Sequence, residues 1–95
     1  MAAYVIGEIE VTDPKAYEDY RRQVDAVNAK YGGRFLARGG KVEILEGGGS
    51  PKRMVVLEFP SMEQLLKWYR SPEYAPLSKL RQKASKGRLV ALEGL

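Results

Sequence analysis

The chain has 95 residues, of which 44% are hydrophobic and 29% charged, a composition typical of one ordinary globular domain. It contains no cysteine and no histidine, which excludes disulfides, imidazole bases, histidine-ligated haem and the usual zinc sites. The formal net charge is +4, but the basic residues are spread along the chain, which favours a solvated surface over a nucleic-acid interface. No apolar run approaches the roughly 18 residues of a membrane span, and no leader segment is visible, so we expect a cytoplasmic protein.

The first half predicts a strand, a capped helix and a second strand. Residues 4–9 form the first strand, after which Asp13 caps a helix and Pro14 takes its first position, where no N–H is needed. Apolar residues (Tyr17, Tyr20, Val24, Val27, Tyr31) then recur at helical spacing, with charged residues (Glu18, Arg21, Arg22, Asp25, Lys30) on the other side. Gly32 and Gly33 end this helix, and the second strand runs from Arg34 to Arg38.

A glycine pair interrupts the second strand. Beyond Gly39 and Gly40, residues 41–46 alternate charged and β-favouring side chains, which predicts a second extended piece after a kink, bulge or small hairpin. Residues 47–51 then form a flexible turn.

The second half repeats the plan of the first. Residues 54–59 form a strand, and Ser61 with Gln64 forms a capping box for a helix whose buried stripe is Met62, Leu65, Leu66 and Tyr69. Pro72 stops this helix. Residues 76–86 predict a third, shorter helix that ends at Gly87, and residues 88–93 predict the last strand.

The element order β-α-β-β-α-β predicts an α+β sandwich of ferredoxin-like type with an antiparallel sheet, formed by residues 1–95 as a single domain. Strand alternation makes both faces of this sheet apolar at the centre, with Tyr4, Ile6, Met54 and Val56 on the second face. Two helices cover only one face, so we expect a homodimer that packs sheet against sheet. The alternative is that the third helix or a loop covers the second face.

Several segments, in their order and spacing, resemble the family known as domain of unknown function 1330, within the dimeric α/β barrel superfamily. These segments are Tyr4-Val5-Ile6, Thr12-Asp13-Pro14, the run from Gly33 to Gly40, Glu46-Gly47, Leu57 to Ser61, and Trp68 to Tyr74. The resemblance implies a ferredoxin-like protomer that dimerises through its sheet into a barrel, with a cavity between sheet and helices. It brings no established reaction. The superfamily includes cofactor-free monooxygenases, lactone isomerases, dehalogenating enzymes and haem proteins, and the absence of histidine argues against the haem branch here.

Arg38 is the first candidate binding residue, because it lies where the second strand meets a glycine pair. Its guanidinium would project beside the unshielded backbone of Gly39, an arrangement that suits a carboxylate or another small anion. The alternative is a structural ion pair with Glu8, Glu46 or Glu58, since a buried arginine rarely lacks a partner.

Glu8 and Glu58 occupy matching positions in the two halves. In a parallel central pair of strands they would face the same side near the strand ends, and their mutual repulsion would raise one pKa, which suits a general acid or base. The alternative is that both carboxylates are paired with Arg34, Arg38 or an arginine of a partner chain.

Aromatic residues gather on the two main helices and on the segment that follows the second. Tyrosines at helical spacing are ordinary core residues, but their hydroxyls can also orient a ligand in an apolar pocket. Tyr20 and Tyr69 are candidates because each lies in a helix where a cavity against the sheet would open, and Tyr74 is a further candidate for ligand contact.

These features predict an enzyme without a cofactor that acts on a small organic acid or aromatic by proton transfer. Arg38 would hold the anion, and Glu8, Glu58 or Tyr20 would move protons. The alternative is a non-catalytic binder or a structural homodimer, so turnover stays open. An RNA-recognition domain shares the element order, but residues 53–59 carry aliphatic side chains where bases would stack.

Overall fold

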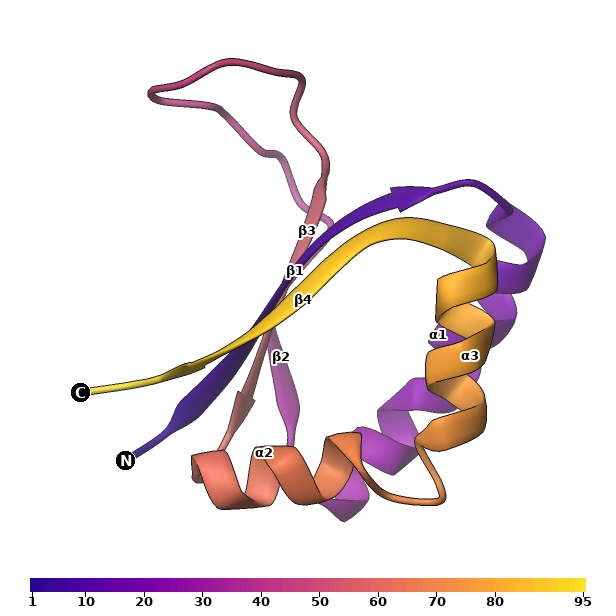
Figure 1. Cartoon of the computed structure of the whole chain (residues 1–95), viewed down its shortest axis with the longest axis vertical. Coiled ribbons are helices and arrows are strands. Elements are labelled where there is room, and N and C mark those ends of the chain that lie inside the picture. The colour runs from indigo at the N-terminus through magenta and orange to yellow at the C-terminus, as the bar shows by residue number, and fades with distance from the viewer.

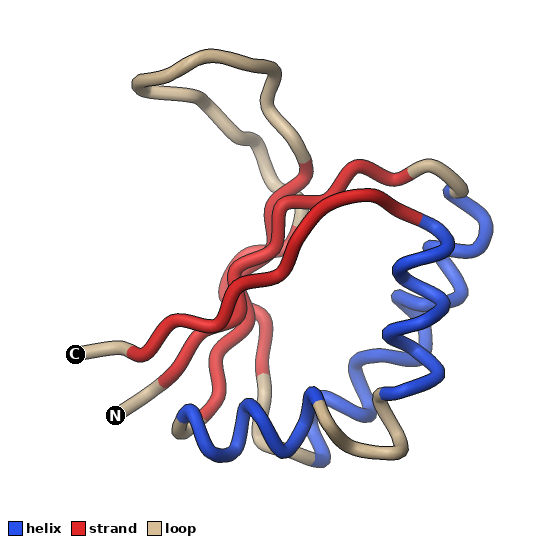
Figure 2. The backbone as a smooth tube through the Cα atoms, viewed as in Figure 1, coloured by secondary structure: helices blue, strands red, loops and turns tan.

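A four-stranded sheet lies against a layer of three helices in the computed structural model, which describes residues 1–95 (Figure 1). The elements in chain order are β1 (Ala3–Val11), α1 (Pro14–Lys30), β2 (Arg34–Arg38), β3 (Arg53–Phe59), α2 (Met62–Tyr69), α3 (Ala75–Ala84) and β4 (Ser85–Glu93). All three helices lie on the same side of the sheet (Figure 2). None of them combines the length and hydrophobicity that a bilayer crossing requires.

The strand order is β2-β3-β1-β4, and every neighbouring pair is antiparallel. This arrangement confirms the α+β class, the element order and the antiparallel sheet. Val5 lies between Leu57 and Ala91 on the face toward the helices. The next residue, Ile6, lies between Val56 and Val90 on the opposite face, because side chains alternate along a strand.

The ends of α1 follow the predicted capping. The Asp13 carboxylate accepts the N–H of Ala16 at 3.2 Å, and proline occupies the first helical position. At the other end, Gly32 has a φ of 80° and donates to the carbonyl of Ala29, while Gly33 donates to that of Asn28 at 2.8 Å. These two bonds form a Schellman motif, in which glycine takes a left-handed conformation that other residues rarely adopt.

Trp68, and not Tyr69, faces the core from α2. The Trp68 side chain is 1% exposed and the Tyr69 side chain 42%. The predicted stripe ran through Tyr69, but a turn of three residues from Leu65 reaches Trp68, the larger apolar surface. The Ser61 hydroxyl accepts the N–H of Gln64 as expected, whereas the Gln64 side chain donates to the carbonyl of Tyr31 and so joins α2 to the end of α1.

Residues 41–46 form no strand, which corrects the predicted extended piece. The segment between β2 and β3 rises past the end of the sheet as a loop (Figure 1), where no neighbouring strand offers partners for its backbone. Leu45 is 90% exposed in this loop. The predicted irregularity in β2 is present, but it lies between Phe35 and Ala37 rather than at the glycine pair.

The hydrophobic core fills the space between the inner sheet face and the helices. Its largest fully buried side chains are Trp68, Tyr74, Phe59 and Val24. The opposite sheet face carries Ile6, Val56 and Val90 in one row and has no covering helix (Figure 2). The alternative in which α3 covers that face is wrong, since α3 packs beside α1. The loop after β2 reaches only one end of the face, where Val42 and Ile44 line a groove with Glu8 and Met54.

The third helix ends earlier than predicted. It stops at Ala84, and Gly87 lies inside β4 with a φ of 149°. A Cβ atom at this position would come within 1.9 Å of the backbone oxygen of Glu8. The absence of a side chain here permits β4 to approach β1 closely.

Gly87→Ala should therefore destabilise the fold. The backbone conformation alone costs about 1–3 kcal/mol for a residue with a side chain, and the contact with a main-chain atom adds to it. Urea unfolding measures the loss. Gly48→Ala is the matched control, since nothing lies within 4 Å of a Cβ there, and equal stability of the two variants would contradict the expectation.

Candidate functional site

A small cavity of about 20 Å³ lies between the inner sheet face and the helices. Aliphatic and aromatic side chains form most of its wall, together with the tyrosines Tyr17, Tyr20 and Tyr74. Four arginines also line it: Arg21 from α1, Arg38 from β2, Arg53 from β3 and Arg81 from α3. No aspartate or glutamate is among the lining residues, so the side chains around the cavity carry positive charge only.

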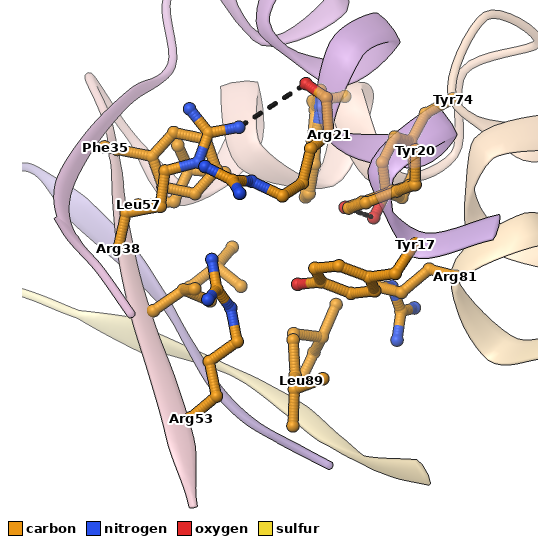
Figure 3. Close-up of a pocket in the computed structure, with 14 residues that line it drawn as sticks. Tyr17, Tyr20, Arg21, Phe35, Arg38, Arg53, Leu57, Tyr74, Arg81 and Leu89 are labelled. Atoms are coloured by element: carbon orange, nitrogen blue, oxygen red, sulfur yellow. Dashed lines mark hydrogen bonds between the residues drawn. The ribbon is translucent and has the colours of Figure 1, made fainter. Parts of the chain in front are cut away.

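Three of these arginines converge in Figure 3. The guanidinium groups of Arg21 and Arg38 lie beside each other, and that of Arg53 points toward them. Arg38 Nη1 lies 3.0 Å from the carboxylate of Asp25, a residue that is mostly solvent-exposed. Its guanidinium carbon also lies 4.1 Å from the centre of the Phe35 ring, which holds it by a cation–π contact.

Arg53 and Arg81 have no acidic partner within 4.0 Å in the chain. The Arg53 guanidinium lies 5.5 Å from the centre of the Tyr17 ring and packs against Gly39. Arg81 is only 7% exposed. Arg53 is partly buried, with its Nε fully enclosed. Arginines with little solvent contact are nearly always paired with an acid, so these two mark the cavity as a place where an anion would restore charge balance.

Buried N–H donors without an acceptor in the chain concentrate at the same cavity. Four of the five such donors belong to lining residues: Nε of Arg21, Nε of Arg53, Nε of Arg81 and Nε1 of Trp68. The fifth, Nδ2 of Asn28, lies outside the cavity. Buried polar atoms are nearly always hydrogen-bonded. Because all four are donors, the complementary group is an acceptor, and a carboxylate offers two acceptor oxygens.

The hydroxyls of Tyr20 and Tyr74 form a buried hydrogen bond at 3.0 Å. Burial, followed by the nearby Tyr74 hydroxyl, raises the pKa of Tyr20 well above its ordinary value of 10.0. The Tyr20 hydroxyl therefore stays protonated across the physiological range. It can donate a hydrogen bond, but so high a pKa makes it a poor proton donor, and the phenolate that would act as a base is not formed.

The structure brings three of the residues predicted from the sequence to this cavity. Arg38, Tyr20 and Tyr74 line it, and Gly39 lies behind the Arg53 guanidinium. Arg38 pairs with Asp25 and not with Glu8, Glu46 or Glu58, the partners that the alternative interpretation named. Tyr69 lies outside the cavity and lines two surface grooves.

Glu8 and Glu58 lie on the open face of the sheet, away from the cavity. The expectation of a parallel central pair is wrong, because β1 and β3 run antiparallel and Glu8 faces Met54 while Glu58 faces Tyr4. Four residues of strand, about 13 Å, separate the two positions, so the carboxylates do not interact. Glu58 accepts a hydrogen bond from Arg34 at 2.8 Å, a pair that the alternative interpretation included. Glu8 lies 3.7 Å from Arg88, which that interpretation did not name.

Sequence reasoning missed Arg21, Arg53 and Arg81 as lining residues. Arg53 extends the alternating series of inward residues Val55 and Leu57 by two positions, a signal that was present in the strand. Arg81 follows Leu77 by four residues in α3 and falls on the same buried stripe. Arg21 was placed on the outer side of α1, but its Nε is buried at the cavity.

No group of three or more His, Cys, Asp or Glu residues is placed to hold a metal ion.

The raised pKa of Tyr20 predicts how stability changes in alkali. Below the unfolded-state pKa of about 10, Tyr20 is protonated in both states and its contribution is fully present. As the pH rises above that value, the unfolded chain loses the proton that the folded chain keeps, so the free energy of unfolding falls. Urea unfolding on both sides of this pH should show the loss, and Tyr20→Phe should reduce it.

Tyr69→Phe, which removes an exposed hydroxyl, is the matched control and should keep the wild-type pH dependence. An alkaline loss of stability that is identical in Tyr20→Phe and the wild type would contradict the assignment to Tyr20.

The fold is shared with several solved structures. The chain is similar to the RPA0582 protein of unknown function from Rhodopseudomonas palustris, with 23% identity, a TM-score of 0.77, and coverage of 99% of this chain and 82% of that one. It is also similar to a dimeric ferredoxin-like protein of unknown function from Jannaschia sp. CCS1, with 13% identity, a TM-score of 0.72, and coverage of 99% and 100%.

A third similar structure is SnoaB, a cofactor-independent oxygenase from Streptomyces nogalater, with 12% identity, a TM-score of 0.68, and coverage of 99% and 93%. At these identities the likeness shows the fold alone. No curated protein matches the sequence. The model of the domain of unknown function DUF1330 matches residues 2–95, and the chain therefore belongs to the DUF1330 family.

Proposed function

We propose that this chain binds a small organic acid through its carboxylate, which enters the cavity between the sheet and the helices. The observation that carries the proposal is the group of four buried N–H donors that have no acceptor in the chain, all on residues around one cavity. A carboxylate is the matching group, since it accepts several hydrogen bonds and neutralises positive charge. Neutral ligands would leave Arg53 and Arg81 without a counter-charge.

The proposed unit is a homodimer that buries the open face of the sheet. That face carries a row of Ile6, Val56 and Val90 without a helix over it, and monomers seldom expose contiguous apolar patches of this kind. Similar structures from Jannaschia and from Bacteroides fragilis are described as dimeric ferredoxin-like proteins. A second copy packed on the open face would leave the cavity on the opposite side of each sheet.

A second candidate function is catalysis without a cofactor, and one feature favours it. Positive charge and a neutral tyrosine hydroxyl surround the cavity, an arrangement that stabilises negative charge developing on a bound substrate. In this scheme Tyr20 donates to the developing oxyanion, and Glu8 and Glu58 take no part because they lie on the other sheet face. The fold shared with a cofactor-independent oxygenase is consistent with such chemistry.

Replacing Arg53 should weaken carboxylate binding. Arg53→Gln keeps hydrogen-bonding capacity but removes the charge, and hydrogen bonds to charged groups contribute about 1.5–3 kcal/mol, so the Kd should rise at least about tenfold. Calorimetric titration with acetate and benzoate measures the change, and thermal shift in the presence of each acid checks it, because a ligand stabilises the state that binds it.

Arg22→Gln is the matched control, since Arg22 is an exposed arginine of α1 that pairs with Asp19 away from the cavity. It should bind like the wild type. Arg38→Ala should also weaken binding, and Arg38→Lys should not restore it, because lysine lacks the planar two-point geometry. Absence of any response to the acids in the wild type, or wild-type affinity in Arg53→Gln, would overturn the proposed site.

A charge placed on the open sheet face should break the dimer. Val56→Asp and Ile6→Asp each bury a carboxylate in an apolar interface, which costs several kcal/mol unless it is paired. Sedimentation at micromolar concentration should show a wild-type dimer and monomeric variants. Ala29→Asp, at an exposed position of α1, is the control and should stay dimeric. A monomeric wild type, or two unchanged dimeric variants, would contradict the proposed interface.

A further inference from the structure

A second space adjoins the arginine-lined cavity. It is a groove of about 370 Å³ between α2 and the edge strand β4, and Val5, Trp68 and Leu89 line both spaces. The rest of the groove wall is formed by Leu65, Leu66, Tyr69, Arg70, Val90 and Ala91. Arg70, at the exposed end of α2, is the one charged residue among them. The groove is therefore apolar where it meets the cavity.

The two spaces differ in size as well as in chemistry. A cavity of about 20 Å³ is little more than a single water molecule needs, so it has no room for the body of an organic acid. A groove of about 370 Å³ falls within the roughly 300–1,000 Å³ of ordinary small-molecule sites. A ligand whose charged end enters the cavity would find room for its remaining atoms only in the groove.

Trp68 lies at the boundary between the two spaces. Its side chain is 1% exposed, and its indole Nε1–H has no acceptor in the chain. The indole thus offers a hydrogen-bond donor without an acceptor, and the rest of its ring adds apolar surface to the groove. An indole in this position contacts both the polar head and the apolar body of a bound molecule.

We infer that the ligand is an amphipathic carboxylic acid, with its carboxylate among Arg21, Arg38 and Arg53 and an alkyl or aryl body in the groove between α2 and β4. The inference rests on the proposed function and adds the class of ligand. Dicarboxylates and short hydroxy acids would bring a second polar group against Leu65, Leu89 and Ala91. Burial without a hydrogen bond disfavours such a group.

A series of straight-chain acids from acetate to octanoate tests this assignment. Each buried methylene improves affinity by about fourfold, so the Kd should fall stepwise with chain length until the groove is filled. Trp68 is the only tryptophan, and its fluorescence and its indole N–H signal in NMR report on both spaces at once. Octanamide carries the same chain without the charge and should bind at least about tenfold more weakly than octanoate.

Two variants separate the groove from the cavity. Ala91→Phe places a ring in the groove and should remove the gain with chain length while acetate binding is kept. Ala29→Phe, at an exposed alanine of α1 that lines no described pocket, is the matched control and should bind like the wild type. The chain-length series in the wild type tests the inference independently if Ala91→Phe folds poorly.

The outcomes distinguish this inference from the proposed function. Equal affinity for acetate and octanoate, with both lost in Arg53→Gln, would overturn the groove assignment and leave the carboxylate site standing. Octanamide binding as tightly as octanoate would overturn the placement of the carboxylate in the cavity. Binding of octanoate that is unchanged in Ala91→Phe would exclude the groove as the site of the alkyl chain. Acids that bind in none of these tests would overturn both.

Discussion

The packing of Trp68 against the sheet and the α2–α3 connection is the contact on which the rest of the site depends. Its ring centre lies 5.0 Å from that of Phe59 and 4.2 Å from that of Tyr74, and burial of an aromatic side chain of about 200 Å² contributes roughly 5 kcal/mol. The Ser71 hydroxyl donates to the Trp68 carbonyl and accepts the N–H of Tyr74. Tyr74 is thereby fixed where its hydroxyl meets Tyr20, so one buried ring positions both the helix layer and the polar wall of the cavity.

The sheet has two apolar faces but only one layer of helices, so its two faces have different surroundings. The inner face meets the helices around a cavity with positive charge. On the outer face, Glu8 and Glu58 of the two central strands pair with arginines of the edge strands. Strand alternation causes this separation, because a residue two positions along stays on its face. Glu8 and Glu58 are thus kept away from the arginine cluster. Asp25 pairs with Arg38 and Glu18 pairs with Arg21, so only Arg53 and Arg81 among the lining arginines lack an acidic partner in the chain.

Local rules predicted most of the fold but less of the site. Asp13, Ser61 and Gly32 set helix ends through bonds within a few residues, so the sequence alone located those ends well. Trp68 and Tyr69 are neighbours, and only packing against Phe59 decides which ring faces inward. The predicted proximity of Glu8 and Glu58 was wrong because it assumed parallel strands. Matching positions in two repeats meet only if the strands run parallel, and β1 and β3 are antiparallel. Arg53 and Arg81 were missed because charged residues on buried stripes are normally assigned to the surface.

The loop between β2 and β3 is hydrogen-bonded to the sheet at its base and has open space around its tip. Gly39 donates to the carbonyl of Met54 at 2.9 Å, so the chain leaves and re-enters the sheet at one place, with Arg38 before the loop and Arg53 after it. The tip glycines Gly47, Gly48 and Gly49 have nothing within 4 Å of a Cβ position. Loop-closure entropy grows slowly with length. Changes of loop length at the tip therefore carry little thermodynamic penalty and leave the geometry of the two arginines in place. Gly47 and Gly49, with φ angles of 95° and 100°, favour glycine at their own positions.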